Sequence, residues 1–196
     1  MFPAEAAIVW KSKARVSKQI GKPNHFYTII LLKAAIFILV DPVFVADVHL
    51  GKLARTLRLL GFDVVYNPAL TREGLRAIAC EQKRVLLSRS VAIAGYAPTA
   101  FCIIQSEKVT EQVQQVVQQF QLQNKFHPFT RCLTCNGLLA DVPKESIADK
   151  LQQKTSIYFT QFWQCTACKR IFWKGSHYNR MLALVTRIQE ANASSN

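Results

Sequence analysis

The chain has 196 residues, of which 50% are hydrophobic and 19% are charged, so it is long and apolar enough to bury a core. Its 25 basic and 12 acidic residues give a formal net charge of +13, which favours a polyanionic partner, most commonly nucleic acid. The most apolar segment, residues 29–40, contains Lys33 and is much shorter than the roughly 20 residues of a membrane helix, so we expect no membrane partner.

The first 42 residues form an extension to which the sequence assigns no structure. Residues 1–24 carry five basic residues against one acid, Glu5, and suit a solvated basic arm, an organelle-targeting peptide or the remnant of another domain. Residues 28–40 suit either a strand or a buried helix, because a nearly continuous apolar run has no period that separates the two.

The pattern of residues 42–66 predicts a strand, a helix and a second strand. Residues 42–48 begin with a proline and continue with β-branched and aromatic side chains, which is typical of a buried strand. Gly61 supplies a left-handed cap where the helix ends, and residues 62–66 form the second strand. Helical spacing between the strands places five apolar side chains on one stripe: Leu50, Leu53, Ala54, Leu57 and Leu60.

Three basic side chains of this helix lie off the apolar stripe. Lys52, Arg55 and Arg58 are therefore expected to point toward water, where they are candidates for contacts with the phosphates of a nucleic acid.

Asp47 lies near the end of the first predicted strand. Ligands of open parallel sheets bind beyond the carboxyl ends of the strands, which makes Asp47 a candidate for chemistry. An alternative is that Asp47 caps the helix that begins near Leu50. The stretch by itself favours neither interpretation.

The following segments continue the alternation of helices and strands. Thr71 can cap a helix that runs to about Lys83, and residues 85–87 and 101–105 read as strands. Valines at helical spacing predict an amphipathic helix over residues 109–120. This alternation indicates an α/β fold with a parallel sheet and helices on both faces.

Two C-x-x-C pairs follow, Cys132 with Cys135 and Cys165 with Cys168. Four thiolates on two short loops can converge tetrahedrally on one zinc ion, with redox or disulfide chemistry as the alternative. Cysteines without a secretory signal indicate a reducing compartment, which we take to be the cytoplasm. Residues 144–153 read as a helix-like spacer, and residues 176–191 as a closing helix.

The same region is both basic and aromatic. Its basic side chains include Arg131, Lys169, Arg170, Lys174 and Arg180, and its aromatic side chains include Phe162, Trp163, Phe172, Trp173 and Tyr178. Cations for phosphates and flat rings for bases are typical of a surface that binds single-stranded RNA. The alternative is that the aromatic side chains fill the small core of the ribbon.

The motifs FVADVHLGKLARTLRLLGFDVVY, VLLSRS, FTRCLTCNGLL and FWQCTACKRIFWKGSHYNRM resemble the Mut-seven C-terminal RNase (Mut7-C) family, in which a PIN-like nuclease fold is followed by a zinc ribbon. We predict four segments: an unassigned basic and apolar extension (1–42), a PIN-like α/β domain (43–126), a zinc ribbon with closing helix (127–185) and a frayed tail (186–196). The resemblance also implies hydrolysis of RNA phosphodiesters, because PIN-like nucleases hold Mg²⁺ or Mn²⁺ with three or four carboxylates.

Only part of that carboxylate set is present. Asp47 matches the first acid and Glu73 is a second candidate, whereas Ser90 stands where the resemblance implies an aspartate. Thr71 and Arg72 occupy further acidic positions. A lost carboxylate weakens divalent binding, and a nearby arginine would repel the ion.

Two functions therefore remain open. One is a metal-dependent ribonuclease with a depleted site, in which Asp47 and Glu73 are catalytic. The other is a catalytically silent RNA-binding module of the same fold. An enzyme acting on small molecules ranks third, because no glycine-rich nucleotide loop is present, and we expect no small-molecule cofactor.

Overall fold

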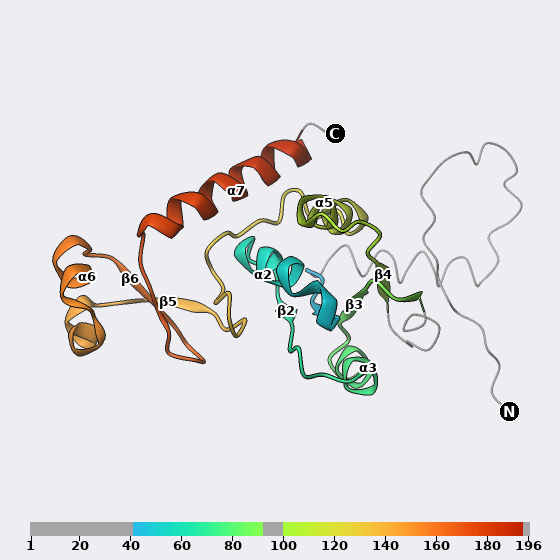
Figure 1. Cartoon of the computed structure of the whole chain (residues 1–196), viewed down its shortest axis with the longest axis horizontal. Helices are drawn as coiled ribbons and strands as arrows, with labels where there is room; N and C mark the ends of the chain where they lie inside the picture. Colours follow the sequence, from blue (N-terminus) through green and yellow to red (C-terminus); the bar gives the residue numbers. More distant parts are fainter. Residues whose placement is uncertain (1–40, 92–99, 194–196) are drawn as a thin grey trace, which may run out of the picture.

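The computed structural model describes residues 41–91 and 100–193. The predictions for residues 1–40 lie outside the described residues. In the part of the chain that the structure describes, the ribbon lies at one end of the molecule and the α/β domain at the other, and the long helix α7 runs from the ribbon back across the α/β domain (Figure 1). Within the described residues, every helix is too short or too polar to cross a membrane.

The α/β domain is built on one sheet of four parallel strands in the order β2-β1-β3-β4. The strands are β1 (Phe44–Ala46), β2 (Val64–Val65), β3 (Val85–Ser88) and β4 (Phe101–Ile103). Since β1 pairs with both β2 and β3, its carboxyl end lies in the middle of one edge of the sheet.

Helices cover both faces of this sheet, as predicted. Alternate residues of a strand point to opposite faces, so Phe44 and Ala46 pack with helices α2 (Gly51–Leu59) and α5 (Val109–Gln119). Val45 instead packs with helix α3 (Arg72–Glu81) on the other face. Two apolar clusters, one on each face, hold the layers together.

The first strand is shorter than predicted. It ends at Ala46, and a 3-10 helix, η1 (Val48–Leu50), begins directly after Asp47. The Asp47 carboxylate accepts a hydrogen bond from the His49 backbone N–H and so caps this turn, which stops the strand and leads into α2.

Gly61 ends α2 in the left-handed region, with a φ of 99°. A side chain here would also collide with another segment, because a Cβ atom would lie 2.2 Å from the His127 carbonyl oxygen. The glycine thus allows the chain that leads into the ribbon to dock directly on the end of α2. Two backbone hydrogen bonds fix that contact, from His127 to Leu60 (2.9 Å) and from Phe129 to Leu59 (3.0 Å).

The ribbon is a three-stranded antiparallel sheet in the order β5-β6-β7. Its strands are β5 (Leu139–Val142), β6 (Phe162–Cys165) and β7 (Ile171–Phe172). The predicted helix-like spacer between β5 and β6 is a 3-10 helix, η2 (Lys144–Lys150), followed by the short helix α6 (Gln153–Tyr158).

Helix α7 runs over Ser176–Ala193, two residues beyond the predicted closing helix, and it includes residues 186–193 of the segment assigned to the tail. Val185 and Ile188 are buried against the core that α2 and α5 share. Asn192 is 2% exposed, and its side-chain amide donates to the Ile188 carbonyl (2.7 Å). The closing helix therefore belongs as much to the α/β core as to the ribbon.

Candidate metal centre and candidate nuclease site

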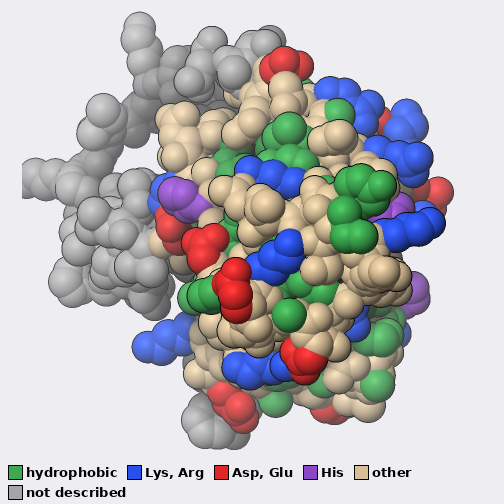
Figure 2. Space-filling model, turned by 90° about the vertical axis from the view of Figure 1, so that its left-hand side faces the viewer, with side chains coloured by type: hydrophobic (Ala, Val, Ile, Leu, Met, Phe, Trp, Pro, Cys, Tyr) green, Lys and Arg blue, Asp and Glu red, His purple; other side chains and the backbone are tan. Residues whose placement is uncertain are grey.

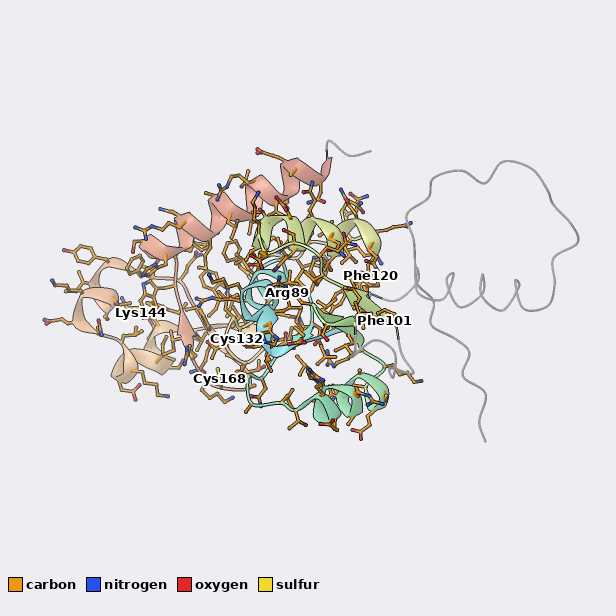
Figure 3. All side chains as sticks on the ribbon, turned by 45° about the vertical axis from the view of Figure 1, so that its right-hand side comes forward. Arg89, Phe101, Phe120, Cys132, Lys144 and Cys168 are labelled. Atoms are coloured by element: carbon orange, nitrogen blue, oxygen red, sulfur yellow. The ribbon has the colours of Figure 1, made fainter. Side chains whose placement is uncertain are left out.

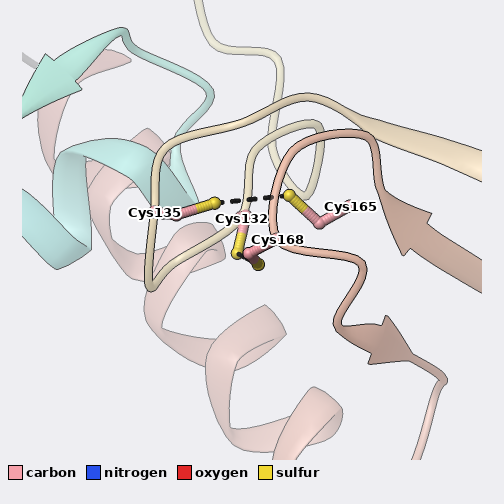
Figure 4. A group of neighbouring side chains, drawn as sticks. All are labelled: Cys132, Cys135, Cys165 and Cys168. Atoms are coloured by element: carbon pink, nitrogen blue, oxygen red, sulfur yellow. Dashed lines mark hydrogen bonds between the residues drawn. The ribbon is translucent and has the colours of Figure 1, made fainter.

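The four ribbon cysteines converge, as their spacing predicted. Their ligand atoms all lie within 4.8 Å of one another. The Sγ atoms of Cys132 and Cys168 are 3.7 Å apart, and those of Cys135 and Cys165 are 3.3 Å apart (Figure 4). Tetrahedral zinc–sulfur bonds of about 2.3 Å would place the sulfurs roughly 3.8 Å apart. The cluster could therefore bind a metal such as zinc with small adjustments.

Both knuckles use the same backbone turn. In the first, the Cys132 N–H donates to the Gly137 carbonyl (2.8 Å); in the second, the Cys165 N–H donates to the Arg170 carbonyl (2.9 Å). The residue after each second cysteine is left-handed: Asn136 has a φ of 72° and Lys169 a φ of 59°. Lys169, a candidate RNA contact, thus also forms part of the turn.

Gly137 keeps the space beside the sulfurs open. A Cβ atom at this position would lie 2.8 Å from the Cys165 Sγ and 3.4 Å from the Cys135 Sγ. Burial acts to raise the pKa of Cys135, but the Gly137 backbone and the neighbouring thiols outweigh burial and lower this pKa to about 6. Cys135 is therefore readily deprotonated, and thiolates are the form that binds metals.

Arg58 does not point toward water as predicted; it is 3% exposed. Its guanidinium donates to the carbonyls of Val64 (2.9 Å), Leu133 (3.2 Å) and Thr134 (2.9 Å). Burial lowers the Arg58 pKa, and electrostatic attraction to Cys135 and Cys132 opposes that shift. Arg58 joins α2 and β2 to the first knuckle, and its burial favours this structural role over the predicted contact with RNA phosphates.

Arg131 is likewise engaged within the protein. It donates to the carbonyls of Gly61 (3.0 Å) and Asn136 (3.1 Å), and its guanidinium lies 3.6 Å from an Asp63 carboxylate oxygen. Asp63 also accepts from Arg84 (2.5 Å) and from the Asn136 amide (2.9 Å). Burial acts to raise the pKa of Asp63, but these partners lower it below its ordinary value. Arg131 and Asp63 therefore hold the ribbon against the sheet.

The metal centre lies where the ribbon meets the α/β domain. Figure 3 shows Cys132 and Cys168 at this junction and Lys144 at the far end of the ribbon. The residues that dock the first knuckle, Gly61 and Val64 among them, lie at the end of α2 and the start of β2. Asp47 lies at the opposite edge of the sheet, where β1 ends.

The Asp47 carboxylate is 3% exposed, and both of its oxygens have partners. Oδ1 accepts from the His49 N–H (3.0 Å) and lies 2.8 Å from the His49 Nδ1 atom, whereas Oδ2 accepts from the Ser88 hydroxyl (2.8 Å). Burial acts to raise the Asp47 pKa, but these hydrogen bonds outweigh it and leave the pKa below its ordinary value. Asp47 is therefore an ionised group that caps η1, in agreement with the capping interpretation, and its role in chemistry stays a prediction.

Of the other candidate groups of the nuclease site, Ser90 lies near Asp47, because both bond to the Ser88 hydroxyl. Glu73, in contrast, belongs to no close group of three or more metal-ligating side chains among the described residues. Glu73 and Arg72 are exposed in the first turn of α3, which Thr71 caps by accepting from the Gly74 N–H (3.1 Å). Ser90 follows β3, and its N–H donates to the Ser88 hydroxyl (3.0 Å).

Among the described residues, the four cysteines are the one group of three or more potential metal-ligating side chains that lie close together. The acids present therefore do not fit the carboxylate set that holds Mg²⁺ or Mn²⁺. Sequence reasoning also missed the two side chains that contact Asp47, His49 and Ser88. The Asp-x-His spacing could have indicated the first, and the position of Ser88 at the end of β3 could have indicated the second.

The remaining basic candidates are at the surface. Lys52 and Arg55 are exposed on α2, as predicted. On the ribbon, the Lys169 ammonium donates to the Thr166 carbonyl (2.8 Å), and Arg170 donates to the Thr134 hydroxyl (2.9 Å). Figure 2, which views the molecule from the ribbon end, shows Lys and Arg side chains mixed with hydrophobic and acidic ones. The positive charge on this face is therefore dispersed.

The fold and the cysteine cluster define an α/β protein whose parallel sheet is joined to a ribbon with a potential zinc site. Comparison with protein families matches residues 42–185 to the Mut7-C RNAse domain. Since this match spans most of the chain, the protein belongs to the Mut7-C RNAse domain family, which indicates a nuclease-like, RNA-related function. No curated protein and no solved structure matches the chain significantly.

Proposed function

We propose that this chain is an RNA-binding member of its family whose acidic site is too depleted for efficient metal-dependent cleavage. The observation that supports this proposal is the environment of Asp47. One carboxylate oxygen of Asp47 contacts His49, and the other accepts a hydrogen bond from the Ser88 hydroxyl. Within the described residues, Asp47 belongs to no close group of three or more metal-ligating side chains. A neutral serine hydroxyl cannot replace the charge of a missing carboxylate.

We also propose that the ribbon holds one structural zinc ion on Cys132, Cys135, Cys165 and Cys168. Sulfur separations close to those of a tetrahedral site support this assignment. The six free thiols of the chain favour a reducing compartment, and we propose the cytoplasm.

A second candidate function is a weak metal-dependent ribonuclease centred on Asp47. Two observations favour it: the family is one of ribonucleases, and Asp47 keeps an ionised carboxylate at the carboxyl edge of the sheet. Measurements of RNA binding and of RNA cleavage separate the two candidates.

We expect the protein to bind single-stranded RNA with an affinity that falls steeply as salt increases, because each neutralised phosphate releases counterions. Replacing Lys169, Arg170 and Lys174 together by alanine should weaken binding. It should also reduce the slope of log affinity against log salt by roughly 2, at about 0.7 per phosphate contact on a single strand. Fluorescence anisotropy at several salt concentrations measures both quantities.

A matched control removes three exposed positive charges elsewhere, at Lys150, Lys154 and Arg187. This variant should keep most of the affinity and the slope. An affinity indifferent to salt, or equal losses in the two triple variants, would contradict a specific role for Lys169, Arg170 and Lys174.

We expect the unaltered protein to cleave RNA weakly or not at all. Ser90→Asp combined with Arg72→Asp should raise Mn²⁺-dependent cleavage by roughly 10- to 100-fold, the range over which partners of a metal site usually act. Asp47→Asn in that background should abolish the gain. Cleavage of a labelled RNA with and without EDTA is the measurement.

The control variant, Ser146→Asp combined with Arg187→Asp, makes the same charge changes at exposed positions away from the Asp47 site. It should not raise cleavage. Efficient cleavage by the unaltered protein that Asp47→Asn removes would establish the second candidate function. Efficient cleavage that survives Asp47→Asn would show that Asp47 is not part of the site.

A further inference from the structure

A cavity of about 360 Å³ lies between the ribbon and the start of helix α7. This volume falls within the range of small-molecule pockets. Five aromatic side chains line the cavity, namely Phe129, Trp163, Phe172, Trp173 and Tyr178. The metal centre and the Asp47 site use none of these rings. Trp173 is also 39% exposed, which is unusual for so large an apolar side chain.

The fold assembles the cavity from separate segments. Trp163 and Phe172 are directly opposite each other on β6 and β7, so their side chains share one face of the ribbon. Tyr178, in the first turn of α7, faces this surface and stacks obliquely on Phe129, with ring centroids 4.7 Å apart. Helix α7, which is anchored on the α/β core, therefore forms the second wall.

Gly175 allows Trp173 to fold over the link between β7 and α7. A Cβ atom at Gly175 would lie 2.9 Å from the Trp173 Nε1 atom. The Gly175 N–H donates to the Trp173 carbonyl (3.0 Å), and its own carbonyl accepts from the Tyr178 N–H (2.9 Å). The FWKGSHY stretch, which the cysteine chemistry does not require, thus supplies several rings of the cavity and the turn that arranges them.

The positively charged side chain of Lys174 lies beside two of these aromatic rings. The Lys174 ammonium lies 5.5 Å from the centroid of the Trp163 ring and 5.7 Å from that of Tyr178. Both rings therefore face one position that a positive charge now occupies, as in cation–π contacts. Among the described residues no acidic side chain lines the cavity, and Asp141, opposite Trp163 on β5, lies outside its lining.

We propose that this cavity binds one unstacked base of single-stranded RNA between its aromatic side chains, with Lys174 on an adjoining phosphate. The proposal rests on the proposed RNA-binding function and adds the site at which a base is held. Flat rings stack on any base, and a nearby ammonium matches the backbone that a base carries with it. The net charge of +13 favours this polyanion over an apolar polypeptide segment.

The cavity is remote from Asp47. Leu59, at the end of α2, lines it, whereas Asp47 precedes the start of that helix. Nine residues at a rise of about 1.5 Å separate the two ends of α2 by about 14 Å. The exposed Lys52 and Arg55 side chains lie on α2. A base in the cavity would anchor an RNA strand whose neighbouring nucleotides lie along this helix.

The test compares two labelled probes of about 12 nucleotides, a single-stranded RNA and the same ribose-phosphate backbone without bases. Trp173→Ala should weaken binding of the RNA by roughly 5- to 100-fold, the effect of losing one stacked base. It should leave binding of the abasic probe within about twofold of the unaltered protein, and it should leave the salt slope unchanged. Trp173→Phe, which keeps a ring, should recover most of the affinity.

Tyr158→Ala provides the matched control, because Tyr158 is 76% exposed on α6 and does not line the cavity. It should leave binding of both probes unchanged. If the unaltered protein binds neither probe, the RNA-binding function and the base site both fall. If it binds RNA but Trp173→Ala has no effect, or weakens both probes equally, the base site alone is refuted. If the unaltered protein binds RNA and Trp173→Ala has no effect on either probe, the cavity is better assigned to an apolar polypeptide.

Discussion

Replacing Cys165 by serine will release the metal from the ribbon and strongly destabilise the protein. Cys165 is fully buried at the end of β6, and its sulfur lies among three others. Structural zinc in small domains supplies about 10–16 kcal/mol of apparent binding free energy, which is also folding free energy. Elemental analysis should find close to one zinc per unaltered chain and almost none in the variant.

The structural damage should extend beyond the ribbon. If the metal stabilised the ribbon alone, its loss would spare the α/β domain. The first knuckle, however, accepts hydrogen bonds from Arg58 and, through the Asn136 side chain, from the Val64 N–H (3.1 Å). Amide hydrogen exchange should therefore rise in the ribbon and at the start of β2, and the central strands β1 and β3 should keep their protection.

Cys80→Ser is the matched control, because Cys80 is a free cysteine on α3 outside the cluster. It should change neither the metal content nor the exchange of the ribbon amides. Intact protein that contains no zinc and carries two disulfides between the four cysteines would refute the structural metal.

Replacing Arg58 by alanine will lower the free energy of unfolding by about 3–5 kcal/mol, the usual cost of removing a buried charged group from its partners. Three carbonyl oxygens, those of Val64, Leu133 and Thr134, lose their charged donor in this variant. Hydrogen bonds to charged groups each contribute about 1.5–3 kcal/mol, and such contributions are not additive. Urea denaturation followed by circular dichroism measures the change.

Two further variants separate a structural role from a phosphate contact. Arg55→Ala removes the same side chain one turn earlier, where it is exposed, and should change the stability by no more than about 0.5 kcal/mol. Arg58→Lys keeps the charge but lacks the planar fork that reaches several carbonyls, so it should recover only part of the loss. An Arg58→Ala protein of unchanged stability but weaker RNA binding would instead make Arg58 a phosphate contact.

Local patterns in the sequence were enough for the elements and for the cysteine cluster. The paired C-x-x-C spacing predicted the four converging sulfurs because each short turn supplies two ligands from the same few residues. Gly61 was predicted to end α2 because few other residues adopt a positive φ at low cost. The alternation of strands and helices predicted the layered sheet because each element must bury an apolar face.

The sequence did not predict the partners that come from distant segments. Helical spacing predicted that Arg58 points toward water, which is wrong because its acceptors Leu133 and Thr134 follow 75 and 76 residues later and cover it. The hydrogen bonds of Arg131 to Gly61 and Asn136, the contact of Ser88 with Asp47 and the packing of α7 on α5 have the same origin. Each of these contacts depends on which helix, strand or loop packs against which other element in the folded protein.

By itself, then, the sequence determined the elements of the α/β layers, the four cysteine ligands, the excess of positive charge and the shortage of acids near Asp47, because these properties reside in residue types and their spacing. Only the tertiary structure decided which cations remain at the surface, that both oxygens of Asp47 are taken, and that the ribbon and α7 enclose an aromatic cavity. The physical reason is that burial and hydrogen-bond partners are set by the docking of whole elements, and a periodic pattern states which face is apolar but not what covers it.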